Sequence, residues 1–173
     1  QKWVDNNTWE KINTILHRKL RKEMGRTENP SAGIIDSQTV KGTPESAKES
    51  GFDSGKLIKG RKRHIVVDTI CYPMVVVVHA ANIFDGKAAR QVLTALFSII
   101  NTVKKIWADG AYKGKKFAEW AKEKFDCVIE VVKKNAAKGF HVLPRRWVVE
   151  RTFAWINRYR RLSKDYERKP TSS

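Results

Sequence analysis

Three carboxylates of this chain lie where the surrounding sequence predicts a folded, partly apolar environment. Asp36 is in the middle of the strand-like segment GIIDSQTV, residues 33–40. Asp109 directly follows a second strand-like segment, and Gly110 behind it lets the backbone turn sharply. Glu150 lies in a C-terminal helical segment, at the border of its apolar stripe. A carboxylate in an apolar strand costs solvation free energy unless a partner compensates its charge, so the pattern indicates a shared cation.

The types of these residues select the chemistry. Two Asp and one Glu supply hard oxygen ligands, which suit Mg²⁺ or Mn²⁺ better than zinc. Two such ions about 4 Å apart can activate an attacking oxygen and stabilise a leaving oxygen in phosphodiester displacement, which requires the three carboxylates to converge within about 10 Å. The structural alternative is that Asp36 caps a turn, Asp109 is a loop residue and Glu150 is an exposed helix charge.

The charge of the chain points to a polyanionic partner. Its 173 residues, enough for one domain, contain 35 Lys and Arg against 18 Asp and Glu, a net charge of +17. Nucleic acid is favoured over a membrane surface, because the basic residues are spread through the chain and no apolar run reaches the length of a membrane span. No signal peptide is visible, and Cys71 and Cys127 are expected to be buried free thiols of a cytosolic protein.

The order of elements predicts an α/β fold with a mixed five-stranded sheet flanked by helices. Strands are expected at residues 33–40, 64–69, 74–80, 103–108 and 127–132. Helices are expected from Thr8 to about Gly25, from Asp85 to Ile100, from Lys115 to Phe125, and from Pro144 to about Arg161. Residues 41–63 are predicted to form a long loop, and residues 133–141 a basic loop.

Two groups of basic residues are candidates for phosphate contacts. The first is a flexible strip in the long loop, with a merely solvated loop as the alternative; its residues are Lys56, Lys59, Arg61, Lys62 and Arg63. The second lies on the final helix, whose arginines are Arg145, Arg146, Arg151, Arg158, Arg160 and Arg161; the candidates for DNA contact among them are Arg146, Arg151 and Arg158. Trp147 either stacks on an unpaired base or packs within the protein, whereas Trp107, Trp120, Phe153 and Trp155 are expected in the core.

Four segments of the chain resemble the DDE transposases of bacterial insertion sequences, and most closely the insertion-sequence-five family. They are IIDSQTVK, GFDSGKLIKGRKRHIVVDT, WADGAYKG and LPRRWVVERTFAWINRYRRLSKDYE, within a similarity that runs from Trp3 to Glu167. The resemblance implies a ribonuclease-H-like fold, with Asp36, Asp109 and Glu150 as a catalytic triad. It also implies a divalent metal, usually Mg²⁺, and the terminal inverted repeats of a mobile element as substrate. Asp68 rivals Asp36, but we expect it outside the metal ligands.

The chain departs from the pattern of the wider superfamily, whose final helix often carries a Tyr, an Arg, the Glu and a Lys. Here Arg146 matches the Arg, whereas Leu143 stands for the Tyr and Asn157, beside Arg158, for the Lys. Family members also carry an N-terminal DNA-binding segment. Residues 1–30 are therefore expected to be a helical remnant of that region, and residues 31–173 a catalytic domain truncated at its C-terminus.

The leading hypothesis is thus a transposase that cleaves and transfers DNA strands at the ends of an insertion sequence. Its expected partners are double-stranded DNA, as inverted repeats and target, and a second copy of the chain when assembled on DNA in the bacterial nucleoid. One alternative is a catalytically incomplete DNA-binding relic or regulator derived from a transposase. A second alternative, a basic RNA-binding or ribosome-associated protein, explains the charge but not the three carboxylates.

Overall fold

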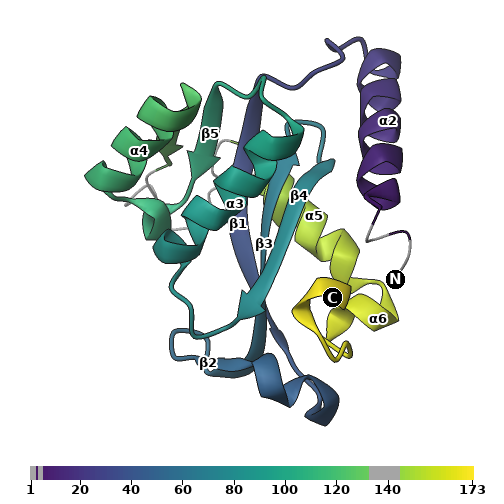
Figure 1. Cartoon of the computed structure of the whole chain (residues 1–173), viewed down its shortest axis with the longest axis vertical. Coiled ribbons are helices and arrows are strands. Elements are labelled where there is room, and N and C mark those ends of the chain that lie inside the picture. Colours follow the sequence, from purple (N-terminus) through teal and green to yellow (C-terminus); the bar gives the residue numbers. More distant parts are fainter. Residues whose placement is uncertain (1–2, 4–5, 133–144) are drawn as a thin grey trace.

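The computed structural model describes residue 3, residues 6–132 and residues 145–173, and it centres on one mixed β-sheet (Figure 1). The strands are β1 (Ala32–Lys41), β2 (Gly51–Asp53), β3 (Ile58–Asp68), β4 (Pro73–Ala80), β5 (Lys105–Ala108) and β6 (Val128–Val131). The α-helices are α2 (Thr8–Glu23), α3 (Asp85–Ile99), α4 (Lys115–Phe125), α5 (Arg146–Asn157) and α6 (Arg160–Ser163). Short 3₁₀ turns cover Pro44–Glu49 (η1), Gly110–Tyr112 (η2) and Pro170–Ser172 (η3).

The sheet has the topology of the ribonuclease-H-like fold. Its main path runs β3-β1-β5-β6, and β4 pairs with the outer edge of β3. Strand β3 is antiparallel to both of its long neighbours, β1 and β4, whereas β5 and β6 are parallel to β1 and are reached through helices. The predicted ribonuclease-H-like α/β fold is therefore confirmed. All five expected strands are present, and the short strand β2 adds a sixth.

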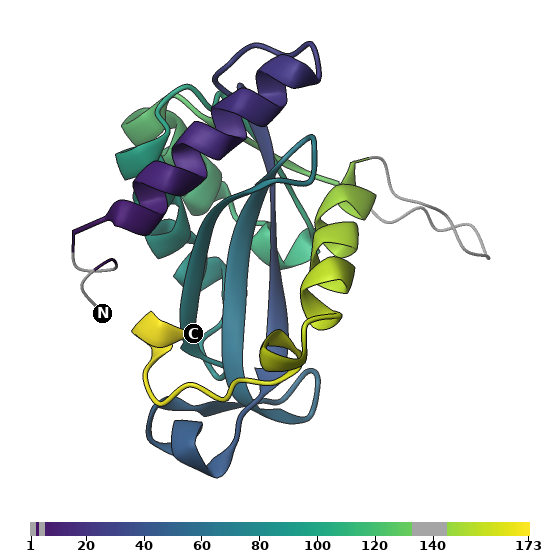
Figure 2. The ribbon, with the colours of Figure 1, turned by 90° about the vertical axis from the view of Figure 1, so that its right-hand side faces the viewer.

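Helices cover both faces of the sheet, with α3 and α4 on one face and α5 on the other (Figure 2). Because side chains alternate along a strand, neighbouring residues of β1 enter different cores. Ile35 joins the core beneath α3, and Ile34 joins the core beneath α5. Asp36 has the same parity as Ile34, so the strand geometry directs its carboxylate to the face covered by α5.

The prediction of a long loop over residues 41–63 is wrong. This segment holds η1 and β2, and β3 begins at Ile58 rather than at His64. Gly60 makes the continuous strand possible, because a Cβ at this position would stand 2.0 Å from the carbonyl oxygen of Val40. The glycine that suggested flexibility in the sequence thus permits close strand packing instead.

The predicted final helix is divided in two. Helix α5 ends at Asn157, and Tyr159 is extended (φ −85°, ψ 120°) before the short α6 begins. The chain then runs beside the residue that follows β1, where Asp165 forms a β-bridge with Gly42. The predicted helix start at Pro144, the position Leu143 and the expected basic loop 133–141 lie outside the described residues.

Helix α2 is anchored to the edge of the sheet by a buried charged cluster. Asp68, at the end of β3, accepts hydrogen bonds from Arg21 and pairs with His17 Nε2 at 2.7 Å. The His17 ring stacks on Tyr72, with 4.6 Å between ring centroids. Asp68 is therefore engaged by α2. That residues 1–30 derive from a separate DNA-binding region stays a prediction.

Both cysteines are buried and free, as expected, and burial raises the pKa of the Cys127 thiol to about 11. Within the described ranges, none of the helices combines the length and the apolar character needed to cross a bilayer.

Candidate active site

The three carboxylates singled out in the sequence converge on one nitrogen atom. Arg146 Nη2 lies 3.2 Å from Asp36 Oδ2, 3.7 Å from Glu150 Oε1 and 3.9 Å from Asp109 Oδ2. Because all three oxygens lie within 3.9 Å of one atom, no two of them can be farther apart than twice that distance. Their separation therefore satisfies the limit of about 10 Å for a shared two-ion site. The predicted convergence of the three carboxylates is therefore confirmed.

The register of the sheet brings the two aspartates together. Strands β1 and β5 are parallel, and Ile34 is paired with Trp107. Asp36 and Asp109 each follow that pair by two residues, so they lie at the same level, Asp36 within β1 and Asp109 just beyond the end of β5. Asp109 then begins the turn η2, where its Oδ1 accepts a hydrogen bond of 2.8 Å from the amide of Ala111. Asp109 thus lies at the carboxyl end of β5, where α/β sheets commonly place ligand sites.

Helix α5 supplies Glu150 and Arg146 from above the sheet. Val148 and Val149 are buried against the sheet, and Thr152 Oγ1 donates a hydrogen bond of 3.2 Å to the carbonyl of Cys71. These contacts orient the helix so that residues 146 and 150, one turn apart, face the aspartates. At the other end of α5, Gln38 Nε2 donates to Asn157 Oδ1 at 3.1 Å. The helix is therefore held to the turn between β3 and β4 through Thr152 and to β1 through Asn157.

The site has more negative charge than its one arginine can neutralise. Burial raises the pKa of Asp36, and the nearby charge of Asp109 raises it further. A hydrogen bond from the Ser37 amide and the charge of Arg146 act in the opposite direction but do not cancel the increase. Glu150 is 60% exposed and can reorient, whereas Asp36 is 15% exposed and held in the strand.

The donor set fits a divalent cation. Three carboxylates around a site with uncompensated negative charge are the ligands that Mg²⁺ and Mn²⁺ prefer. In the arrangement seen here, Arg146 takes the position that the acids share, and over the described residues no three Asp, Glu, His or Cys side chains already form a metal-binding group. A cavity of about 670 Å³ adjoins the site and is lined by Asp109, Lys113, Val131 and Arg146, among others. Its volume is in the range of ligand-binding clefts.

Comparison with known proteins identifies the family. Residues 27–172 match the model of the transposase DDE domain. The chain belongs to the transposase DDE domain family. It is 28% identical, over 118 residues, to a Burkholderia cepacia protein assigned as the transposase for insertion sequence element IS402. This match covers 64% of the chain and 55% of the relative, so the chain spans about half the length of that protein.

Solved structures with a similar arrangement include a chain of a viral intasome and a viral integrase catalytic core. The simian T-cell lymphotropic virus intasome aligns over 75% of this chain and 40% of its own, with a TM-score of 0.49 and 17% identity. The HTLV-2 integrase catalytic core in complex with magnesium aligns over 75% and 70%, with a TM-score of 0.47 and 16% identity. Since these likenesses are distant, the fold assignment for this DDE domain depends on its strand order.

A buried polar network supports the site from the opposite face of the sheet. Ser37 Oγ donates a hydrogen bond of 3.1 Å to Asp85, and Lys62 Nζ pairs with the same carboxylate at 2.8 Å. His64 Nδ1 lies 2.8 Å from His79 Nε2, and burial lowers the pKa of His64 to about 3, which keeps the ring neutral. In the sequence, Asp85 was identified only as the first residue of an expected helix, and this role was missed. The pairing of β3 with β1 and β4 brings Ser37 and the two histidines together, and the start of α3 supplies Asp85.

The expected basic strip of the DDE domain separates into exposed and buried residues. Lys56 and Lys59 are exposed on the β2–β3 hairpin and stay candidates for phosphate contacts. The prediction is wrong for Arg61, Lys62 and Arg63, whose exposed fractions are at most 6%. Arg61 pairs with Asp165 at 3.2 Å and donates to four carbonyls. Lys62 pairs with Asp85, and Arg63 donates to the carbonyls of Leu162 and Lys164. His64, which directly follows the strip, is fully buried as well.

The outer face of α5 carries exposed aromatic and basic residues. Trp147 is 42% exposed and Trp155 is 43% exposed, so the expectation that Trp155 is a core residue is wrong. The guanidinium of Arg151 lies 4.6 Å from the ring centroid of Trp155 and 5.9 Å from that of Trp147. Arg158 is exposed farther along the chain. By contrast, Trp107 is buried as expected, and Trp120 and Phe153 pack against the two cores.

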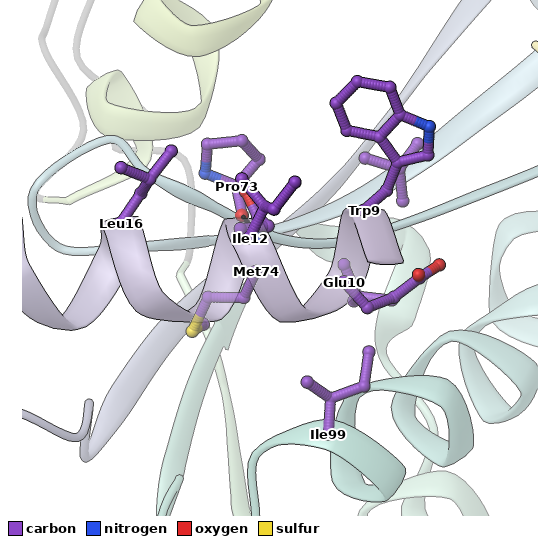
Figure 3. Close-up of a pocket in the computed structure, with 10 residues that line it drawn as sticks. Trp9, Glu10, Ile12, Leu16, Pro73, Met74 and Ile99 are labelled. Carbon is purple, nitrogen blue, oxygen red and sulfur yellow. Dashed lines mark hydrogen bonds between the residues drawn. The ribbon is translucent and has the colours of Figure 1, made fainter. Parts of the chain in front are cut away.

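An apolar groove lies apart from the carboxylates, between α2, the start of β4 and the end of α3 (Figure 3). Trp9, Ile12 and Leu16 line it from α2, with Met74 and Ile99 opposite. None of its lining residues is a triad carboxylate. The groove is therefore a separate feature of the DDE domain.

Proposed function

We propose that this domain carries the catalytic site of a transposase that cleaves and joins DNA strands by metal-dependent phosphoryl transfer. The observation that carries the proposal is the meeting of Asp36, Asp109 and Glu150, from two strands and a helix, around a single cationic atom. Three carboxylates separated by 114 residues of sequence are brought together at the same end of the sheet. A purely structural role for all three does not explain why their charges are left undercompensated.

In this proposal, Asp36, Asp109 and Glu150 hold two Mg²⁺ or Mn²⁺ ions. When bound, such ions polarise the scissile phosphate and stabilise the attacking and leaving oxygens. The protein supplies the rest by positioning. The two aspartates are fixed by the β1–β5 register, whereas Glu150 is free to adjust to the ions and the substrate.

The substrate proposed is double-stranded DNA, in the form of terminal inverted repeats and target, bound by a homodimer assembled on DNA. The proposed phosphate contacts are basic and exposed: Lys56 and Lys59 on the hairpin, Arg151 on α5, and Arg158 directly after α5. We also propose that Trp147, three residues before Glu150, stacks on an unpaired base, because its ring is exposed and aromatic rings are suited to such stacking.

A plasmid-nicking assay tests the chemistry. With Mg²⁺ or Mn²⁺ the protein should convert supercoiled plasmid to nicked circles, and EDTA should prevent this. Asp109→Asn should reduce nicking to background and leave DNA binding intact, because the amide keeps the size of the carboxylate but loses the charge that holds a hard cation. Asp126→Asn is the matched control. Asp126 is exposed and has φ 51°, a conformation that asparagine tolerates.

Each outcome of the assay has a distinct meaning. Nicking by Asp109→Asn at the wild-type rate would contradict the carboxylate mechanism. If the wild-type protein binds DNA without metal and does not nick it with any metal, the alternative of a DNA-binding regulator is favoured. Asp68→Asn is unsuitable as a control, since it would leave Arg21 buried opposite an uncharged partner.

A further inference from the structure

Arg146 is bonded unlike the structural arginines of this fold. Arg61 and Arg21 are each at most 5% exposed and donate to carbonyl oxygens as well as to an aspartate. Arg146 instead directs Nη2 to three carboxylates, and only its contact with Asp36 has the length of a hydrogen bond. The contacts of 3.7 and 3.9 Å with Glu150 and Asp109 are held by charge alone. Such contacts are readily exchanged.

The position of Arg146 in its helix gives no local reason for a cation. It is the first residue of α5, directly after Arg145, and the first turn contains no acidic residue. The amino end of a helix carries a partial positive charge, so two arginines there oppose the helix dipole. The carboxylates, rather than the helix, therefore account for where the guanidinium lies. Beside it, the cavity lined by Asp109 and Arg146 offers space into which the side chain can turn.

We propose that Arg146 is the built-in counter-ion of the triad, which holds the three acids together in the metal-free protein and competes with divalent cations for them. The proposal rests on the metal-binding function proposed above. It also predicts a link between substrate and metal. A DNA phosphate is a good partner for a guanidinium. When such a phosphate binds Arg146, the carboxylates become free to bind metal. By linkage, metal bound at the carboxylates must then strengthen DNA binding equally.

The test is Mn²⁺ binding by calorimetry, with Arg146→Gln compared with the wild-type protein and with Arg151→Gln. The control removes the same charge one turn farther along α5, from an exposed residue with no ion pair to the triad given by the structure. Without DNA, Arg146→Gln should bind Mn²⁺ about tenfold more tightly than Arg151→Gln, within the usual range of coupling between sites. A random-sequence duplex should raise the Mn²⁺ affinity of the wild-type protein more than that of Arg146→Gln. Equal or weaker Mn²⁺ binding by Arg146→Gln without DNA would overturn the competition.

Thermal unfolding in EDTA separates failure of this inference from failure of the metal site. With Arg146 present, Asp109→Asn removes an attraction and should lower Tm or leave it unchanged. In the Arg146→Gln background, the same change removes only repulsion between acids and should raise Tm. Absence of this reversal would overturn the counter-ion role whatever the metal data show. A clear reversal without Mn²⁺ binding to any variant would instead overturn the metal-binding function and the competition built on it.

Discussion

Arg61 and Arg146 each lie beside a carboxylate, yet their surroundings are opposite in kind. The ion pair of Arg61 with Asp165 is completely buried, and further donors of Arg61 reach the carbonyls of Glu167 and Arg168. One positive charge there meets one negative charge. At Arg146, one positive charge meets three carboxylates at a partly open site. The charges at Arg61 balance within the protein, whereas the charges at Arg146 balance only when a further cation binds.

The comparison shows that a run of basic residues in the sequence is not by itself a DNA-binding surface. The basic residues of segment 56–63 were interpreted as one phosphate-binding strip, but only Lys56 and Lys59, at the hairpin end, are exposed. Residues 61–63 instead bind the C-terminal segment and Asp85. Overall charge predicts the type of partner, whereas burial decides which residues can reach it.

The largest expected effect is on stability, for Arg61→Met. Removing the arginine leaves Asp165 buried without a charge partner and several carbonyls without donors. Loss of one partner of a buried pair costs about 3–5 kcal/mol, so the free energy of unfolding should fall by that amount in urea denaturation. Arg158→Met is the exposed control and should change it by no more than about 0.5 kcal/mol. Equal stabilities for the two variants would contradict the contrast between buried and exposed arginines.

A smaller and different effect is expected at the hairpin, for the double change of Lys56 and Lys59 to Ala. Each lost phosphate contact flattens the slope of log affinity against log salt by about 0.9, so the pair should flatten it by about 1.8. Stability should stay unchanged, because both lysines are exposed. The control changes two exposed lysines of α4, Lys122 and Lys124, to Ala. If both double changes flatten the slope equally, the proposal that the hairpin contacts DNA specifically is contradicted.

Much of the site could be predicted because it depends on local patterns and strand order. Asp36 lies within a recognisable strand and Asp109 just after another, and parallel pairing of those strands is enough to bring them together. Glu150 and Arg146 share a helix face by their spacing alone. The burial of Arg61 could not be predicted in this way. It depends on Asp165, more than a hundred residues later, and no local pattern links the two.

The remaining errors have similar causes. The glycines and lysines of residues 41–63 suggested a loop, but pairing with β1 and β4 outweighs the weak strand propensity of that segment. Trp155 was expected in the core together with Trp107, Trp120 and Phe153. The apolar stripe of α5 includes Phe153 and Ile156, and Trp155 lies outside it. Large aromatic residues are thus an unreliable sign of burial when helix periodicity places them elsewhere.

The most direct test of the account is anomalous diffraction from crystals of this protein grown with Mn²⁺. The account predicts anomalous density bounded by Asp36, Asp109 and Glu150, with the Arg146 guanidinium moved out of the position that the three carboxylates share. Manganese bound only at other acidic residues, or saturating Mn²⁺ that leaves the three carboxylates on Arg146 and free of metal, would contradict it.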